Sequence, residues 1–98
     1  MRPIHADVLA DLARRWRLSE VAVFGSTARG EDGPDSDLDL LITFEDDAPW
    51  SLLDLATLKL ELEEVSGRRV DLVERAALVN PYRRRSILRD ARTLYAAG

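Results

Sequence analysis

The sequence contains no cysteine and a single histidine, His5, which limits how the chain can bind a metal ion. Without cysteine there are no disulfides and no thiolate ligands, and one histidine near the terminus does not make a zinc site. Any metal site must therefore be built from carboxylates, whose oxygen atoms suit hard ions such as Mg²⁺.

Long apolar runs are also missing, and none approaches the roughly 20 residues that span a bilayer. The first seven residues already include Arg2 and Asp7, so they do not resemble an export signal. Apolar residues make up 46% of the chain and charged residues 33%, which is typical of a soluble globular protein. We expect a cytoplasmic protein without membrane association.

The length of 98 residues allows one sheet covered by helices but leaves no room for a second substrate domain. We expect a single domain over residues 1–98. The net charge is −4, which argues against direct nucleic-acid binding, and the basic residues are all arginine except Lys59.

Apolar periodicity predicts alternating helices and strands. It favours a helix over residues 3–17, a strand over 20–24, a helical turn over 26–29, a strand over 37–44, a helix over 50–65 and a strand over 70–73. A last helix enters at Asn80-Pro81, with inward residues Ile87, Leu88, Ala91, Leu94 and Tyr95. The prediction is a small α/β domain with a mixed three-stranded sheet and flanking helices.

The predicted sheet gathers three carboxylates. The first two strands pair antiparallel because their loop is short, and the third is parallel to the second because a helix connects them. Asp37, Asp39 and Asp71 then lie on one face at one end of the sheet. Since like charges so close oppose ionisation, we expect a compensating cation there. Asp37 and Asp39 are about 7 Å apart along the strand, which suits a pair of metal ions.

A phosphate site is predicted beside these carboxylates. Gly25 permits a tight turn, and Ser26 opens a helical turn whose free N–H groups and hydroxyl suit phosphate oxygens. A phosphate site, two metal ions and a third carboxylate are what in-line attack on a nucleotide phosphorus requires. The residues therefore predict nucleotidyl transfer.

Gly25-Ser26, ten further residues and Asp37-Leu38-Asp39 together resemble the signature of the DNA polymerase beta nucleotidyltransferase superfamily. The stretches at 24–30 and 34–41 resemble its minimal branch more closely. The resemblance continues through residues 70–73 and 80–82 to Leu94-Tyr95, and so covers essentially the whole chain.

This resemblance implies an antitoxin that transfers AMP from ATP to a tyrosine hydroxyl of a HEPN-domain ribonuclease toxin. It also implies that Asp37 and Asp39 bind two Mg²⁺ ions, and that Asp71 binds the catalytic one and helps to deprotonate the tyrosine. Gly25 and Ser26 would hold the triphosphate, and Arg29 would add positive charge. Position 27 is often arginine in such sequences, so the role of Thr27 stays open.

Other interpretations stay open at this point. The chain is alternatively an antitoxin that only binds its toxin, or an enzyme acting on a small molecule, against which the missing second domain argues. Arg29 is alternatively a surface ion-pair residue. Arg83, Arg84 and Arg85 begin the last helix, where positive charge opposes the helix dipole; they form a solvated face or meet an anion or acidic partner.

Overall fold

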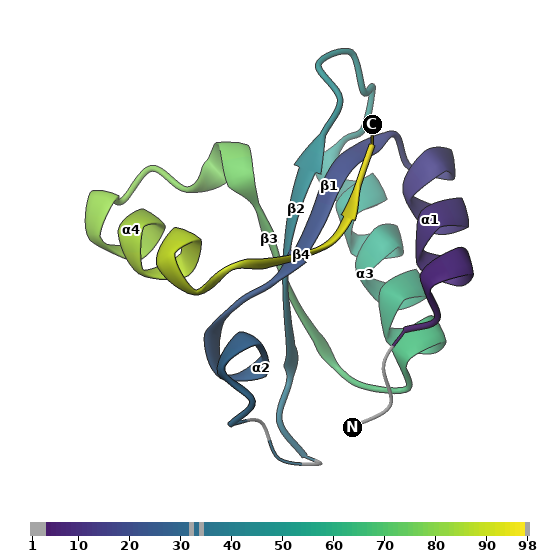
Figure 1. Ribbon diagram of the computed structural model, residues 1–98. Helices are drawn as coiled ribbons and strands as arrows, with labels where there is room; N and C mark the ends of the chain where they lie inside the picture. Colours follow the sequence, from purple (N-terminus) through teal and green to yellow (C-terminus); the bar gives the residue numbers. More distant parts are fainter. Residues whose placement is uncertain (1–3, 32, 34, 98) are drawn as a thin grey trace.

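The computed structural model describes residues 4–31, 33 and 35–97. Figure 1 shows a central sheet with helices on both sides. The elements in chain order are α1 (Ala6–Arg15), β1 (Leu18–Val23), α2 (Gly25–Arg29), β2 (Leu38–Phe44), α3 (Leu52–Ser66), β3 (Val70–Glu74), a 3₁₀ turn η1 (Arg75–Ala77), α4 (Pro81–Asp90) and β4 (Arg92–Ala96). No helix in these ranges is long and apolar enough to cross a membrane.

The α/β class and the mixed sheet agree with the sequence analysis, but the sheet has four strands, in the order β3-β2-β1-β4. The last helix was predicted to continue through Leu94 and Tyr95, and this is wrong: it ends at Asp90, and Ala91 is extended. The following residues form β4, which pairs antiparallel with β1 and places Tyr95 opposite Val21. This pairing satisfies the backbone N–H and C=O groups along the second edge of β1. Such hydrogen bonds between distant segments cannot be predicted from a local apolar pattern.

The helices cover the two faces of the sheet unequally. In Figure 1, α1 and α3 lie together on one side, and α4 lies on the other with the short α2 below it. The larger buried cluster joins α1 and α3 to the sheet through residues that include Leu12, Leu40, Ile42, Leu58 and Leu62. A smaller cluster under α4 contains Ala22, Phe24, Leu41, Val73, Leu78 and Ile87. The face under α2 and α4 is therefore the more open one.

The first and third helices are joined by polar contacts as well as by apolar packing. The indole nitrogen of Trp16, at the end of α1, donates to Glu61 Oε2 of α3 at 2.9 Å, and Arg15 also contacts the Glu61 carboxylate. Trp50 donates to the Trp16 carbonyl oxygen at 2.7 Å, with the two ring centroids 4.8 Å apart. These contacts hold α1 and α3 together as the layer that covers this face of the sheet.

Candidate active site

Two of the predicted aspartates are direct neighbours in the structure. β2 and β3 are parallel, and their register places Asp39 opposite Asp71. Leu38 and Leu40 belong to the cluster under α1 and α3, so the alternation of β2 turns Asp39 to the other, more open face. Adjacent strands lie about 4.8 Å apart, so the two carboxylates share one small region.

Asp37 lies just before β2 rather than within it. Its side chain is half exposed, and its Oδ1 lies 3.3 Å from the guanidinium Nε of Arg69. Within the described ranges, no three acidic or histidine side chains are arranged to hold a metal ion. The structure therefore brings Asp39 and Asp71 together, whereas Asp37 is turned toward Arg69.

The electrostatics of Asp39 show that the charges of the other two carboxylates nevertheless act on it. Partial burial raises the pKa of Asp39, and the negative charges of Asp71 and Asp37 raise it further. The positive charges of Arg29 and Arg68 oppose this rise in pKa only in part. A partly buried carboxylate with a second carboxylate beside it is stabilised by a bound cation, so the oxygen donors of Asp39 and Asp71 fit a divalent ion such as Mg²⁺.

Gly25 lies directly against the Asp39 side chain. Its φ is +59°, and a Cβ built at this position would lie 2.7 Å from Asp39 Oδ2. The adjacent Phe24 N–H donates to the Asp39 carbonyl oxygen at 3.1 Å, which joins the end of β1 to the start of β2. Both the backbone conformation and the close contact require glycine here.

Ser26 and Thr27 follow in α2, and the two hydroxyls differ in their surroundings. The Ser26 hydroxyl forms no hydrogen bond with any residue that the structure describes, and its side chain is partly exposed. Thr27 is buried, and its Oγ1 accepts a hydrogen bond from the Asp39 N–H at 3.3 Å. Sequence reasoning assigned Thr27 no contact; the structure shows that it helps to hold the Asp39 backbone.

Arg29 is engaged in ion pairs. Its Nε lies 3.2 Å from Glu31, and its Nη1 lies 2.8 Å from Asp90, which links α2 to α4. This geometry agrees with the ion-pair alternative for Arg29, although its charge still acts on Asp39.

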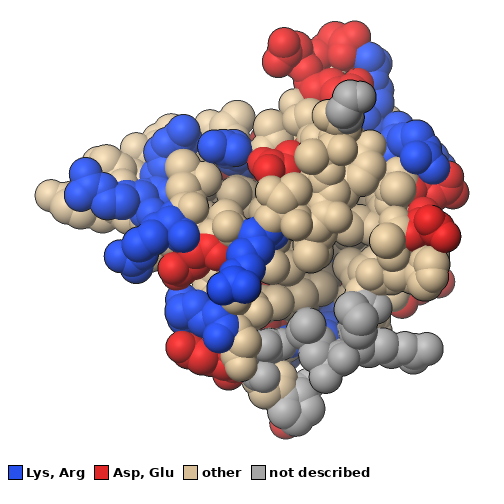
Figure 2. Space-filling view, viewed as in Figure 1, with Lys and Arg blue, Asp and Glu red and all other residues tan. Residues whose placement is uncertain are grey.

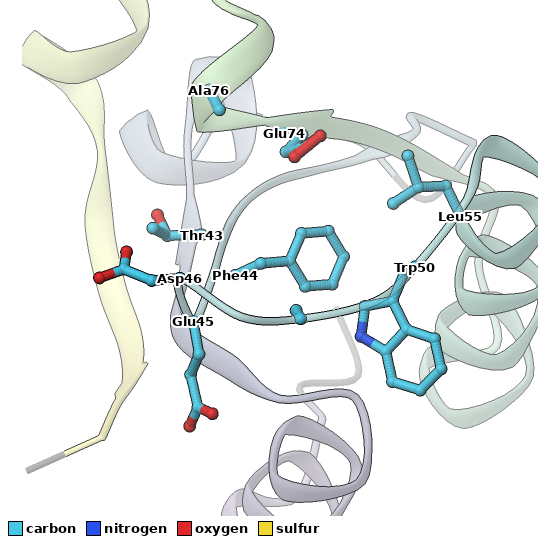
Figure 3. Close-up of a pocket in the computed structure, with 9 residues that line it drawn as sticks. Thr43, Phe44, Glu45, Asp46, Trp50, Leu55, Glu74 and Ala76 are labelled. Carbon is cyan, nitrogen blue, oxygen red and sulfur yellow. The ribbon is translucent and has the colours of Figure 1, made fainter.

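Two hollows in the described part of the surface are lined by residues other than Asp37, Asp39 and Asp71. One of about 310 Å³ lies at the far end of β2, where Figure 3 shows Phe44 between Thr43 and Leu55, with Glu74 above it. None of the predicted site residues lines this hollow. Another, of about 320 Å³, is lined by Asp35, Ser36, Gly67, Arg68 and Arg69 and adjoins the segment that leads to Asp37. The candidate site is therefore identified by its carboxylate residues and not by a deep pocket.

Comparison with known proteins identifies the family of the chain. Residues 6–94 match the nucleotidyltransferase domain family. The protein adenylyltransferase MntA of Thermococcus cleftensis is 46% identical over 68 residues, which are 69% of this chain and 67% of that protein. A solved structure provisionally described as a minimal nucleotidyltransferase is also 46% identical, with a TM-score of 0.73, and the match covers 89% of this chain and 86% of that one.

A more distant similarity supports the fold. One chain of a solved complex between an MNT antitoxin and a tri-AMPylated HEPN toxin of Shewanella oneidensis is 17% identical, with a TM-score of 0.70. The match covers 99% of this chain and 74% of that one. Because the family match extends over nearly the whole sequence and the carboxylate site lies within it, the chain belongs to the nucleotidyltransferase domain family and is a minimal nucleotidyltransferase.

Proposed function

We propose that this enzyme is a Mg²⁺-dependent protein adenylyltransferase that transfers AMP from ATP to a tyrosine hydroxyl of a cognate HEPN-domain toxin, and thereby acts as the antitoxin. The observation that carries the proposal is the pairing of Asp39 with Asp71, with Gly25 packed against Asp39. The 46% sequence identity with an MntA adenylyltransferase and the fold shared with a chain of an AMPylated HEPN complex support a HEPN-domain toxin as the acceptor. A cytoplasmic location follows from the need for ATP.

Asp37, Asp39 and Asp71 are the residues that would hold two Mg²⁺ ions. Bound Mg²⁺ would neutralise the phosphate oxygens and lower the charge that opposes attack. Asp37 joins this set when its pair with Arg69 opens. The pair lies at the surface, where such contacts contribute little to stability, so opening it costs little.

Asp71 is the proposed proton acceptor because its side chain is exposed and lies beside Asp39 on the open face. The tyrosine hydroxyl gives its proton to Asp71, and its oxygen bonds to the α-phosphorus of ATP. The bond from that phosphorus to the bridging oxygen breaks, and pyrophosphate leaves in line. The N–H groups that follow Gly25 and the Ser26 hydroxyl are the proposed contacts to the triphosphate.

The test is intact mass spectrometry of the cognate HEPN toxin after incubation with this protein, ATP and Mg²⁺. We expect mass gains of whole AMP units on the toxin. These gains disappear with the Asp37→Asn/Asp39→Asn variant, with EDTA, and with a toxin whose acceptor tyrosine is replaced by phenylalanine.

Two other outcomes would contradict the proposal. If the toxin is inhibited in a stable complex without gaining mass, the chain is a binding antitoxin. If ATP is converted to pyrophosphate only when a small hydroxyl compound is present, the acceptor is a small molecule.

A further inference from the structure

Positive charge is concentrated at the C-terminal end of this acidic protein. Residues 75–98 contain six arginines and one aspartate, whereas the first 74 residues contain 17 acidic and eight basic residues. In Figure 2 the basic side chains gather on the side of the molecule where α4 lies in Figure 1. The chain therefore presents a basic surface although its net charge is −4.

These arginines also differ from the others in their contacts. Every described arginine before α4 has an ion pair or a hydrogen bond within the protein. In the ranges that the structure covers, the arginines without such a partner are Arg83, Arg84, Arg85 and Arg92. Carboxylates outnumber basic groups in this chain, so a shortage of acids does not explain why these four arginines lack partners.

Helix stability does not explain the basic residues either. Pro81 is the first residue of α4, Asn80 caps it by accepting from the N–H groups of Tyr82 and Arg83, and the first turn has no acidic residue. Positive side chains at this end oppose the helix dipole. Their presence is unfavourable for the isolated fold and becomes favourable only beside an external negative charge.

Apolar and aromatic groups are exposed at the same place. Tyr82 is 82% exposed and Val79 is 85% exposed, and both adjoin the arginines at the start of α4. Tyrosine and arginine are enriched in protein interfaces, where the ring packs and the guanidinium pairs. We call Val79, Tyr82, Arg83, Arg84 and Arg85 the α4 surface.

The α4 surface lies on the same side of the sheet as the aspartates. Ile87 of α4 packs in the cluster with Leu41 and Val73, on the face to which Asp39 also points. The ion pair between Arg29 and Asp90 fixes α4 against α2, which begins at Gly25. A macromolecule bound to α4 is thus held on the face of the sheet that carries the site of transfer.

Resting on the proposed function, we infer that the α4 surface docks an acidic region of the protein that accepts AMP. A protein is favoured over a nucleic acid because Val79 and Tyr82 offer apolar contact area. A phosphate backbone extending past α4 would also meet the acidic excess of the remaining chain. Complementary charge would orient the acceptor and speed its association.

The test compares two charge-reversal variants in the full-length protein. Arg83→Glu/Arg84→Glu alters the α4 surface, and Arg14→Glu/Lys59→Glu makes the same change in net charge on exposed residues of α1 and α3, across the sheet. Acidic residues near the start of α4 suit the helix dipole, so the first variant is expected to fold. Melting temperatures check that both variants do.

Binding to the HEPN-domain acceptor is measured without ATP, at low and at high salt. We expect the dissociation constant to rise roughly tenfold for the α4 variant and to stay near the wild-type value for the control. The difference should shrink at high salt, since screening weakens contacts between exposed charges. The Michaelis constant for ATP should be the same in both variants.

Several results would overturn this inference. Equal binding of both variants to the acceptor would do so, as would a raised Michaelis constant for ATP with unchanged acceptor binding, which would assign these arginines to the nucleotide. Loss of binding to an RNA oligonucleotide with unchanged acceptor binding would point to nucleic acid. If the wild-type protein binds the acceptor but transfers no AMP, the proposed function fails while docking is still tested.

Discussion

A side chain at Gly25 is disfavoured both by the backbone conformation of this residue and by the Asp39 side chain beside it. Its φ of +59° lies in the left-handed region, and an added Cβ would lie 2.7 Å from Asp39 Oδ2. That oxygen ends a short side chain, so it can move aside only by leaving its place beside Asp71. Two effects therefore follow from one substitution: backbone strain and displacement of a proposed metal ligand.

We predict that Gly25→Ala and Gly67→Ala each lower the free energy of unfolding by roughly 1 kcal/mol, because both glycines have positive φ. Only Gly25→Ala should also reduce the rate of AMP transfer, by about tenfold or more, since a Cβ at Gly67 meets no atom within 4 Å. Urea unfolding and the transfer assay measure the two effects. Equal transfer rates in the two variants would show that Asp39 does not depend on the space at Gly25.

At the scale of elements, Glu61 joins α3 to α1. Burial tends to raise the pKa of Glu61, but hydrogen bonds from Arg15 and Trp16 outweigh this and leave its pKa lowered. A carboxyl with a lower pKa in the folded state stabilises the fold fully above its unfolded-state pKa. That stabilisation is lost as the pH falls through the folded-state pKa.

We predict that Glu61→Gln lowers the free energy of unfolding by about 1 kcal/mol at pH 7, with little change in AMP transfer. The difference from the wild type should shrink as the pH falls below the ordinary glutamate pKa and then through the lower folded-state pKa, where the wild-type Glu61 also becomes uncharged. Tryptophan fluorescence during urea unfolding reports on this helix pair. The control is Glu64→Gln, at an exposed position on α3, which should leave the free energy of unfolding unchanged. If both variants show the same pH dependence, the contacts of Glu61 with Arg15 and Trp16 are not its cause.

For the whole molecule, unfolding is linked to the charge gathered at the site. The pKa of Asp39 is higher in the folded than in the unfolded chain, so its ionised form destabilises the metal-free fold above that folded-state pKa. This penalty disappears as the pH falls below the unfolded-state value. A ligand that binds only the folded state has the opposite effect and stabilises it by about 2.7 kcal/mol at 100 times its Kd.

We predict that Asp39→Asn melts at a higher temperature than the wild type in EDTA at pH 7, and that this advantage fades as the pH is lowered. Saturating Mg²⁺ and ATP should raise the wild-type melting temperature by on the order of 10 °C and leave the variant nearly unchanged. Differential scanning fluorimetry measures both. A variant that melts below the wild type in EDTA would mean that Asp39 stabilises the fold by contacts of its own.

The sequence predicted most of the elements because their periodicities are strong and local. The alternation in β2 correctly separated Leu38 and Leu40 from Asp39, and the helical connection correctly predicted β3 parallel to β2. The prediction failed for Leu94 and Tyr95, which suit a helix by spacing. Their conformation depends instead on the free edge of β1, some 70 residues earlier in the chain.

The fold class and the nucleotidyl-transfer reaction could be predicted from the sequence, which also predicts a carboxylate site, because periodicity, residue type and spacing along the chain are local properties. Which groups contact one another depends on the folded arrangement of the elements. It placed Asp37 with Arg69, Arg29 with Asp90, and Thr27 with the Asp39 backbone, and among the described residues it gave Arg83, Arg84 and Arg85 no partner. These contacts join residues from different elements, and their distances follow from packing, which no spacing along the chain specifies.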